Sequence, residues 1–128
     1  MAPTTTRRRA ARRALPEPAW QPQQQTQFLI DYYGGVTKLA TVLDVAKSQP
    51  SRWKSGVEVP SLATAKKILD LEAVLRRALL LWEPQVARIW LESSNAYLDH
   101  ARPIDVLMTR GPSEVIEALD SALAGGYA

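Results

Sequence analysis

Helical spacing of the apolar residues is the feature that most constrains this chain. From Phe28 onward, apolar residues recur at intervals of three and four, which is the spacing of one face of an α-helix. The sustained apolar–polar alternation of a half-buried strand is absent, and the β-branched residues are scattered among good helix formers. The sequence therefore predicts an all-α fold.

Glycine pairs and prolines divide this pattern into separate helices. The first helix begins near Phe28 and ends at Gly34-Gly35, and a second, short helix begins near Thr37, a plausible N-cap. A third ends at Gly56, because glycine readily takes the left-handed conformation that stops a helix. Two short helices joined by a tight turn form a recurrent compact unit.

The longest helix should open at Ser61 and extend to about Trp82, where Glu83-Pro84 breaks it. Its polar side carries the oppositely charged pairs Lys66–Asp70 and Glu72–Arg76 at i,i+4 spacing. We expect three or four short helices beyond it, whose starts are marked by Asn95, Pro103 and Ser113.

Charge is distributed unevenly along the 128 residues, although the net charge is only +3. Five arginines and one glutamate give residues 1–23 a net +4, whereas three arginines and seven acids give residues 83–128 a net −4. We expect a disordered Arg/Pro/Gln-rich arm over residues 1–25, a helical unit with its long helix over 26–82, and a second helical domain over 83–128. The basic N-terminal part suits a polyanion as its partner. The acidic C-terminal part suits a different partner, a protein surface.

The residue inventory argues against an enzyme. With no cysteine and one histidine, the chain has no Cys/His dyad, no residue cluster with metal-ligand spacing and no phosphate-binding loop, so we expect no catalytic site, metal or cofactor. We expect His100 to be a surface or capping residue, Arg76-Arg77 to form a solvated face, and Trp90 and Tyr97 to lie in the core. No apolar run is long enough to span a membrane and no secretory signal is evident, so we expect a cytoplasmic protein.

Residues 39–60, LATVLDVAKSQPSRWKSGVEVP, resemble the helix-turn-helix of the Xre/Cro-like family. Val45 and Trp53 would anchor the unit in the core, and a helix presenting arginine and glutamine can read guanine and adenine in the major groove. Pro50 departs from the family pattern, and because proline fits only a first turn, we start this recognition helix at Ser48. The predicted DNA-binding residues are Thr37, Lys38, Lys47, Ser48, Gln49, Ser51, Arg52 and Lys54.

Residues 86–126 resemble the toxin-binding domain of the MbcA/ParS/Xre antitoxins. The matching positions are Trp90, Asn95, Leu98, Arg102-Pro103-Ile104-Asp105, Leu107, Gly111, Val115, Leu119 and the terminal glycines. This resemblance implies an antitoxin that binds a RES-domain, NAD-degrading toxin, blocks its active site and represses its own operon. It also implies toxin contacts through Asn95, Arg102, Gly125, Gly126, Tyr127 and Ala128, with the small-residue tail entering the toxin's cleft.

Taken together, the two resemblances imply an Xre/Cro-like unit joined by a long helix to a small helical toxin-binding domain. The expected partners are the cognate toxin, operator DNA and a second copy of the chain, because such repressors usually bind two half-sites. One alternative is a stand-alone transcription regulator whose C-terminal helices only mediate dimerisation. Another is a protein-interaction module whose basic unit has lost DNA binding, for which Pro50 is the motive.

Overall fold

The structure, a computed structural model, describes residues 21–125. Within this range the chain is helical with no strand, which confirms the all-α expectation. Residues 1–20, Gly126, Tyr127 and Ala128 lie outside the described residues, and so do the expectations placed on them. The elements are α2 (Pro22–Tyr33), α3 (Val36–Leu43), α4 (Gln49–Ser55), α5 (Leu62–Ala78), α6 (Pro84–Glu92), the 3-10 turn η1 (Ala96–Leu98), α7 (Pro103–Arg110) and α8 (Ser113–Gly125).

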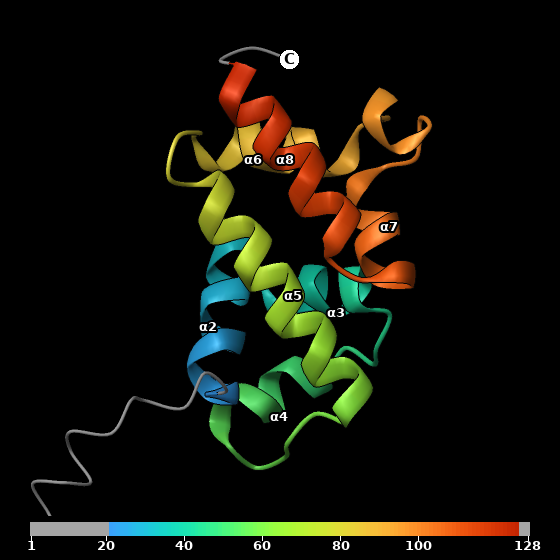
Figure 1. The fold of residues 1–128 in the computed structure, drawn as a ribbon. Helices are drawn as coiled ribbons and strands as arrows, with labels where there is room; N and C mark the ends of the chain where they lie inside the picture. The colour runs from blue at the N-terminus through green and yellow to red at the C-terminus, as the bar shows by residue number, and fades with distance from the viewer. Residues whose placement is uncertain (1–20, 126–128) are drawn as a thin grey trace, which may run out of the picture.

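Helix α5 is the central element of the molecule (Figure 1). It contacts α2 and α3 from the first half of the chain and α7 and α8 from the second half. Helix α4 packs against α2 and α3 and lies at one end of the molecule, and the C-terminal end of α8 lies at the opposite end (Figure 1). The exposed side of α4 and the C-terminal end of α8 therefore lie far apart, at opposite ends of the molecule (Figure 1).

One continuous cluster of buried apolar side chains runs through both halves, from Leu29 in α2 to Leu119 in α8. Helix α5 contributes its centre, since Ile68, Leu71 and Val74 are fully buried. Burying a side chain of this size stabilises the fold by roughly 1.5–3 kcal/mol. Because α5 serves both halves, the two share one core.

Several local sequence signals are confirmed. The Ser61 hydroxyl accepts a hydrogen bond from the Thr64 N–H at 3.2 Å, and Pro103 is the first residue of α7. The Asn95 side chain accepts from the Tyr97 N–H at the start of η1. The two predicted i,i+4 ion pairs also form, with N–O distances of 2.9 Å for Lys66–Asp70 and 3.0 Å for Arg76–Glu72.

The expected arm over residues 1–25 ends too late, because α2 begins at Pro22. Proline suits the first turn of a helix, where its missing N–H would have no intrahelical partner. Gln25 is buried, and its side-chain amide donates to Glu72 Oε1 on α5 at 2.9 Å. This tertiary contact holds the glutamine-rich segment in the fold, although its composition indicated a solvated tail.

Two other predicted helix starts are corrected. Thr37 is not the cap of α3, because the Gly35 carbonyl already accepts the Leu39 N–H and the helix begins at Val36. Ser113 is the first residue of α8, and the Pro112 carbonyl accepts the Ile116 N–H. The cap is the residue whose carbonyl accepts the first hydrogen bond of the helix. Residue type alone does not determine which carbonyl that is.

The long helix is also shorter than expected, since α5 ends at Ala78 and not at Trp82. After Ala78 the backbone changes to i→i−3 bonds, from Leu80 N–H to the Arg77 carbonyl and from Leu81 N–H to the Ala78 carbonyl. These tighter bonds turn the chain before Pro84, so that α6 can lie across the end of the bundle (Figure 1).

Candidate nucleic-acid and partner interfaces

Helix α4 is held against the body of the protein by Pro50 and Trp53, which are both buried. Pro50 occupies the first turn, as the sequence required, and Ser48 directly precedes the helix. The opposite side of this short helix carries only exposed side chains, Ser51, Arg52 and Ser55. Ser55 shares this side with Ser51 but was missed, because a serine just before a stop glycine resembles an ordinary helix end.

Six of the eight predicted DNA-binding residues lie together in residues 47–54. All of the eight except Gln49 are exposed. The exposed ones are Thr37, Lys38, Lys47, Ser48, Ser51, Arg52 and Lys54. Gln49 is half-buried, and its Oε1 accepts the Ala46 N–H at 3.3 Å. Thr37 and Lys38 lie at the start of α3, which contacts α4. We call Lys47, Ser48, Ser51, Arg52, Lys54 and Ser55 the basic face.

Arg52 is the one arginine of the basic face, and 58% of its side chain is exposed. Its only ionic neighbour in residues 21–125 is Glu58, with Nη1 at 3.9 Å from Oε1. A contact of this length lies beyond hydrogen-bond range, so the guanidinium fork keeps its donors available for an acceptor pair such as a guanine edge.

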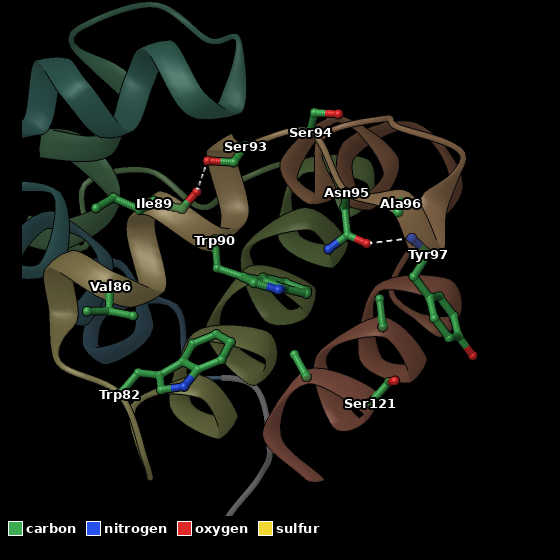
Figure 2. Close-up of a pocket in the computed structure, with 12 residues that line it drawn as sticks. Trp82, Val86, Ile89, Trp90, Ser93, Ser94, Asn95, Ala96, Tyr97 and Ser121 are labelled. Carbon is green, nitrogen blue, oxygen red and sulfur yellow. Dashed lines mark hydrogen bonds between the residues drawn. The ribbon is translucent and has the colours of Figure 1, made fainter. Parts of the chain in front are cut away.

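The second half of the molecule carries an open cavity of about 610 Å³ between α6, η1 and α8 (Figure 2). We call it the apolar groove. Its lining is mostly apolar and aromatic: Trp82, Val86, Ile89, Trp90, Ser93, Ser94, Asn95, Ala96, Tyr97, Ala118, Ser121 and Ala122. A volume of this size is typical of sites that bind a ligand or a short peptide segment.

Two tryptophans lie on one side of the apolar groove and a tyrosine lies on the other (Figure 2). The ring centroids of Trp82 and Trp90 are 5.9 Å apart and inclined at 50°. Tyr97 is 56% exposed, so the expectation that it lies in the core is wrong. Trp90 is half-buried and packs against the core cluster while it also lines the groove. Helical spacing places a side chain on a face, and in this case no other element covers that face.

Among the predicted toxin-binding residues, Asn95 lines the apolar groove. Its Oδ1 accepts the Tyr97 N–H at 2.9 Å, which fixes the orientation of the amide (Figure 2). The amide nitrogen, which donates to nothing in residues 21–125, remains a donor for a bound molecule. Gly125 is exposed at the end of α8, one turn beyond the lining residue Ser121.

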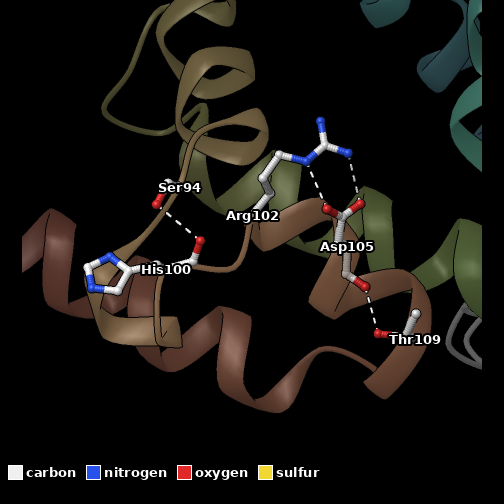
Figure 3. A network of polar contacts seen from close by, with 5 residues as sticks. All are labelled: Ser94, His100, Arg102, Asp105 and Thr109. Atoms are coloured by element: carbon white, nitrogen blue, oxygen red, sulfur yellow. Dashed lines mark hydrogen bonds and ion pairs between the residues drawn. The ribbon is translucent and has the colours of Figure 1, made fainter.

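Arg102 does not line the groove. Its Nε and Nη2 donate to the two carboxylate oxygens of Asp105 at 2.8 and 2.9 Å (Figure 3). These hydrogen bonds lower the pKa of the Asp105 carboxyl. No cluster of metal-ligating side chains from residues 21–125 surrounds the exposed His100, and the His100 carbonyl accepts from the Ser94 hydroxyl at 3.0 Å. The Arg102–Asp105 pair therefore links the residue before α7 to the first turn of that helix.

No group of three or more acidic or histidine side chains in the described part of the chain is placed to hold a metal ion. None of the helices in residues 21–125 combines the length and apolar character needed to cross a bilayer.

The chain is similar to a known antitoxin. No protein-family model matches the chain. It is 26% identical over 89 residues to the mycobacterial cidal antitoxin MbcA of Mycobacterium bovis and of Mycobacterium tuberculosis, an alignment that covers 70% of this chain and 78% of the relative. Its fold matches a chain in the crystal structure of the M. tuberculosis MbcT–MbcA toxin–antitoxin complex, with a TM-score of 0.68, 20% identity and coverage of 83% of this chain and 96% of that chain.

Proposed function

We propose that this chain is the antitoxin of a toxin–antitoxin pair and acts by binding its toxin, not by catalysis. The observation that carries the proposal is the combined sequence and fold similarity to MbcA, which extends over both halves of the molecule. The apolar groove supports it, because an exposed apolar concavity on a small helical protein is a common mark of a protein-binding site.

The toxin in this proposal has a RES domain and degrades NAD, as the resemblance of residues 86–126 to antitoxins of such toxins implies. Asn95, Arg102 and the end of the chain from Gly125 to Ala128 contact the toxin, and the tail blocks its active site. One structural fact supports access at this end, since Gly125 is exposed at the end of α8. In this proposal both proteins act in the cytoplasm, where they meet the NAD pool and the operator DNA.

The second activity that we propose is repression of the chain's own operon through the basic face. Its exposed lysines and Arg52 provide phosphate and base contacts, and Thr37 and Lys38 add phosphate contacts from α3. A homodimer would place two basic faces on half-sites one helical turn apart. The order of the two sequence resemblances supports this proposal, because the Xre/Cro-like unit comes first and the antitoxin-like module follows the long helix.

The alternative function is a stand-alone regulator whose C-terminal helices only hold a dimer together. The apolar groove is also compatible with this alternative, because a second copy of the chain could cover it. A partner toxin distinguishes the two, since only an antitoxin protects the cell from a neighbouring gene product.

The test is to express the adjacent open reading frame alone, with the full chain, and with a chain that lacks residues 126–128. We expect the neighbour alone to stop growth and deplete NAD, and the full chain to restore both. The shortened chain should still co-purify with the neighbour but protect NAD less well, because the binding surface is intact and the blocking tail is gone. A neighbour that is harmless alone, or that the full chain neither binds nor silences, would overturn the antitoxin proposal.

A further inference from the structure

We propose that Glu58 determines the DNA specificity of the basic face by acting on Arg52. In this proposal the Glu58 carboxylate disfavours contacts between Arg52 and a phosphate, whereas contacts between Arg52 and a base edge remain. The inference rests on the proposed binding of operator DNA. It goes beyond that proposal, because it separates how tightly the basic face binds any DNA from how well it selects one sequence.

The first observation is that the loop after α4 folds back on the helix and brings Glu58 to Arg52. Gly56 ends α4 in the left-handed conformation. The Glu58 N–H then donates to the Arg52 carbonyl at 3.3 Å, and Pro60, two residues further on, is buried. The backbone therefore holds Glu58 beside Arg52, and their proximity does not depend on attraction between the two side chains.

The second observation is the geometry of the two charged groups. Glu58 Oε1 lies 3.9 Å from Arg52 Nη1. This oxygen is buried and accepts no hydrogen bond from residues 21–125. The carboxylate is therefore close enough to act on the guanidinium charge but leaves the donors of the fork free. Because both side chains are partly exposed, so loose an ion pair contributes little to stability, and its effect should fall on what Arg52 binds.

The third observation is that, among residues 21–125, an acid pairs with only one cation of the basic face. Lys47 and Lys54 form no ion pair with these residues, whereas Arg52 has Glu58 beside it. A lysine ammonium is a point charge that suits a phosphate, and an arginine fork can donate two hydrogen bonds to a guanine edge. The acid is thus placed beside the one cation that is suited to reading bases.

These observations predict unequal effects of Glu58 on the two kinds of DNA contact. A phosphate that accepts from Arg52 brings a full negative charge close to the carboxylate, and the two repel each other. A guanine edge carries only partial charges, so its repulsion is much weaker. Phosphate contacts carry no sequence information, whereas base contacts do. Glu58 therefore lowers the affinity for unrelated DNA more than the affinity for the operator, which raises the ratio of the two.

The test measures binding of the full chain to its own upstream DNA and to unrelated DNA of equal length, over a series of salt concentrations. Glu58→Gln keeps the shape of the side chain and removes its charge. We expect it to raise the affinity for unrelated DNA by about threefold or more and to leave the affinity for upstream DNA nearly unchanged. For unrelated DNA, the slope of log K against log salt should steepen by about one, the effect of one added phosphate contact.

Two controls separate this effect from net charge and from direct contact between Glu58 and DNA. Glu114→Gln removes the same charge on α8, where Glu114 pairs with Arg110 at 3.3 Å, and it should leave the ratio of the two affinities unchanged. In a chain that already carries Arg52→Ala, Glu58→Gln should also leave that ratio unchanged, because Glu58 acts through Arg52. Matching thermal unfolding curves show that every variant keeps the fold.

The possible outcomes separate this inference from the proposed function. If the wild type prefers upstream DNA and Glu58→Gln keeps the same ratio, Glu58 does not set specificity, while operator binding stands. An equal fall of the ratio in Glu114→Gln would assign the effect to net charge, and a fall in the Arg52→Ala background would assign it to direct contact with DNA. Either result overturns the inference. If the wild type binds both DNAs equally, operator recognition fails and the inference fails with it.

Discussion

At the scale of single residues, Arg52 carries the sharpest expectation. Replacing it with alanine should weaken binding to the chain's own upstream DNA by about 1–3 kcal/mol, because a fork with two donors to one base edge is lost. Fluorescence anisotropy with labelled upstream DNA measures the change. Arg110→Ala is the matched control, since Arg110 lies on α7, pairs with Glu114 at 3.3 Å and carries the same charge. An equal loss in both variants would mean that only net charge matters.

At the scale of elements, α4 shows how a short helix is defined at both ends. Pro50 fits its first turn and Trp53 fixes its inner face, so a seven-residue helix keeps one orientation although it has little intrinsic stability. Gly56 ends it with a φ of 81°, and the Gly56 N–H donates to the Trp53 carbonyl at 3.2 Å. The presentation of the basic face therefore depends on this one glycine as much as on the basic residues.

Gly56→Ala should lower the free energy of unfolding by about 1–2 kcal/mol, the usual strain of a left-handed alanine. A Cβ at Gly56 would also run into Gln23 Nε2, but Gln23 is exposed and its flexible end can move away. Urea unfolding measures the difference. Gly125→Ala serves as the control, because the added methyl meets nothing within 4 Å and should leave stability nearly unchanged. Equal stability of the Gly56 variant and the wild type would refute the role given to this turn.

At the scale of the whole molecule, the two halves are joined by polar contacts as well as by the shared core. Arg88 on α6 donates to the carbonyl of Tyr32, in the last turn of α2, at 2.6 Å, and its guanidinium lies 5.2 Å from the ring centre of Tyr32. The Tyr32 hydroxyl donates to the Pro84 carbonyl at 2.9 Å. Arg77, expected on a solvated face, is exposed but pairs with Asp120 on α8, so it too bridges the halves.

We expect Arg88→Ala to destabilise the protein by about 1–3 kcal/mol, because the half-buried Tyr32 carbonyl loses its side-chain donor. Unfolding followed by tryptophan fluorescence is suitable, since Trp53 lies in the first half and Trp90 in the second. Arg77→Ala is the comparison and should cost clearly less, because its ion pair is exposed to solvent. If both variants unfold like the wild type, the junction depends on the apolar core alone.

Much of the fold could be predicted because its signals are local. The spacing of apolar residues, the cap at Ser61, the proline at position 103 and the i,i+4 ion pairs all depend on neighbours a few residues away. The signals that failed depend on distant residues. Gln25 joins the fold through Glu72 on α5, and the turn after Ala78 is set by where α6 must pack.

The amino-acid sequence alone determined that the described chain is helical, where most helices begin and end, and which side chains form the exposed basic segment at residues 47–54. It determined these because helix periodicity and capping act over three or four residues. Only the tertiary structure decided which apolar faces are covered. Trp90 and Leu91 are adjacent on one helix, yet Leu91 lies in the core and Trp90 lines the open groove, because burial depends on which distant helix packs against each side.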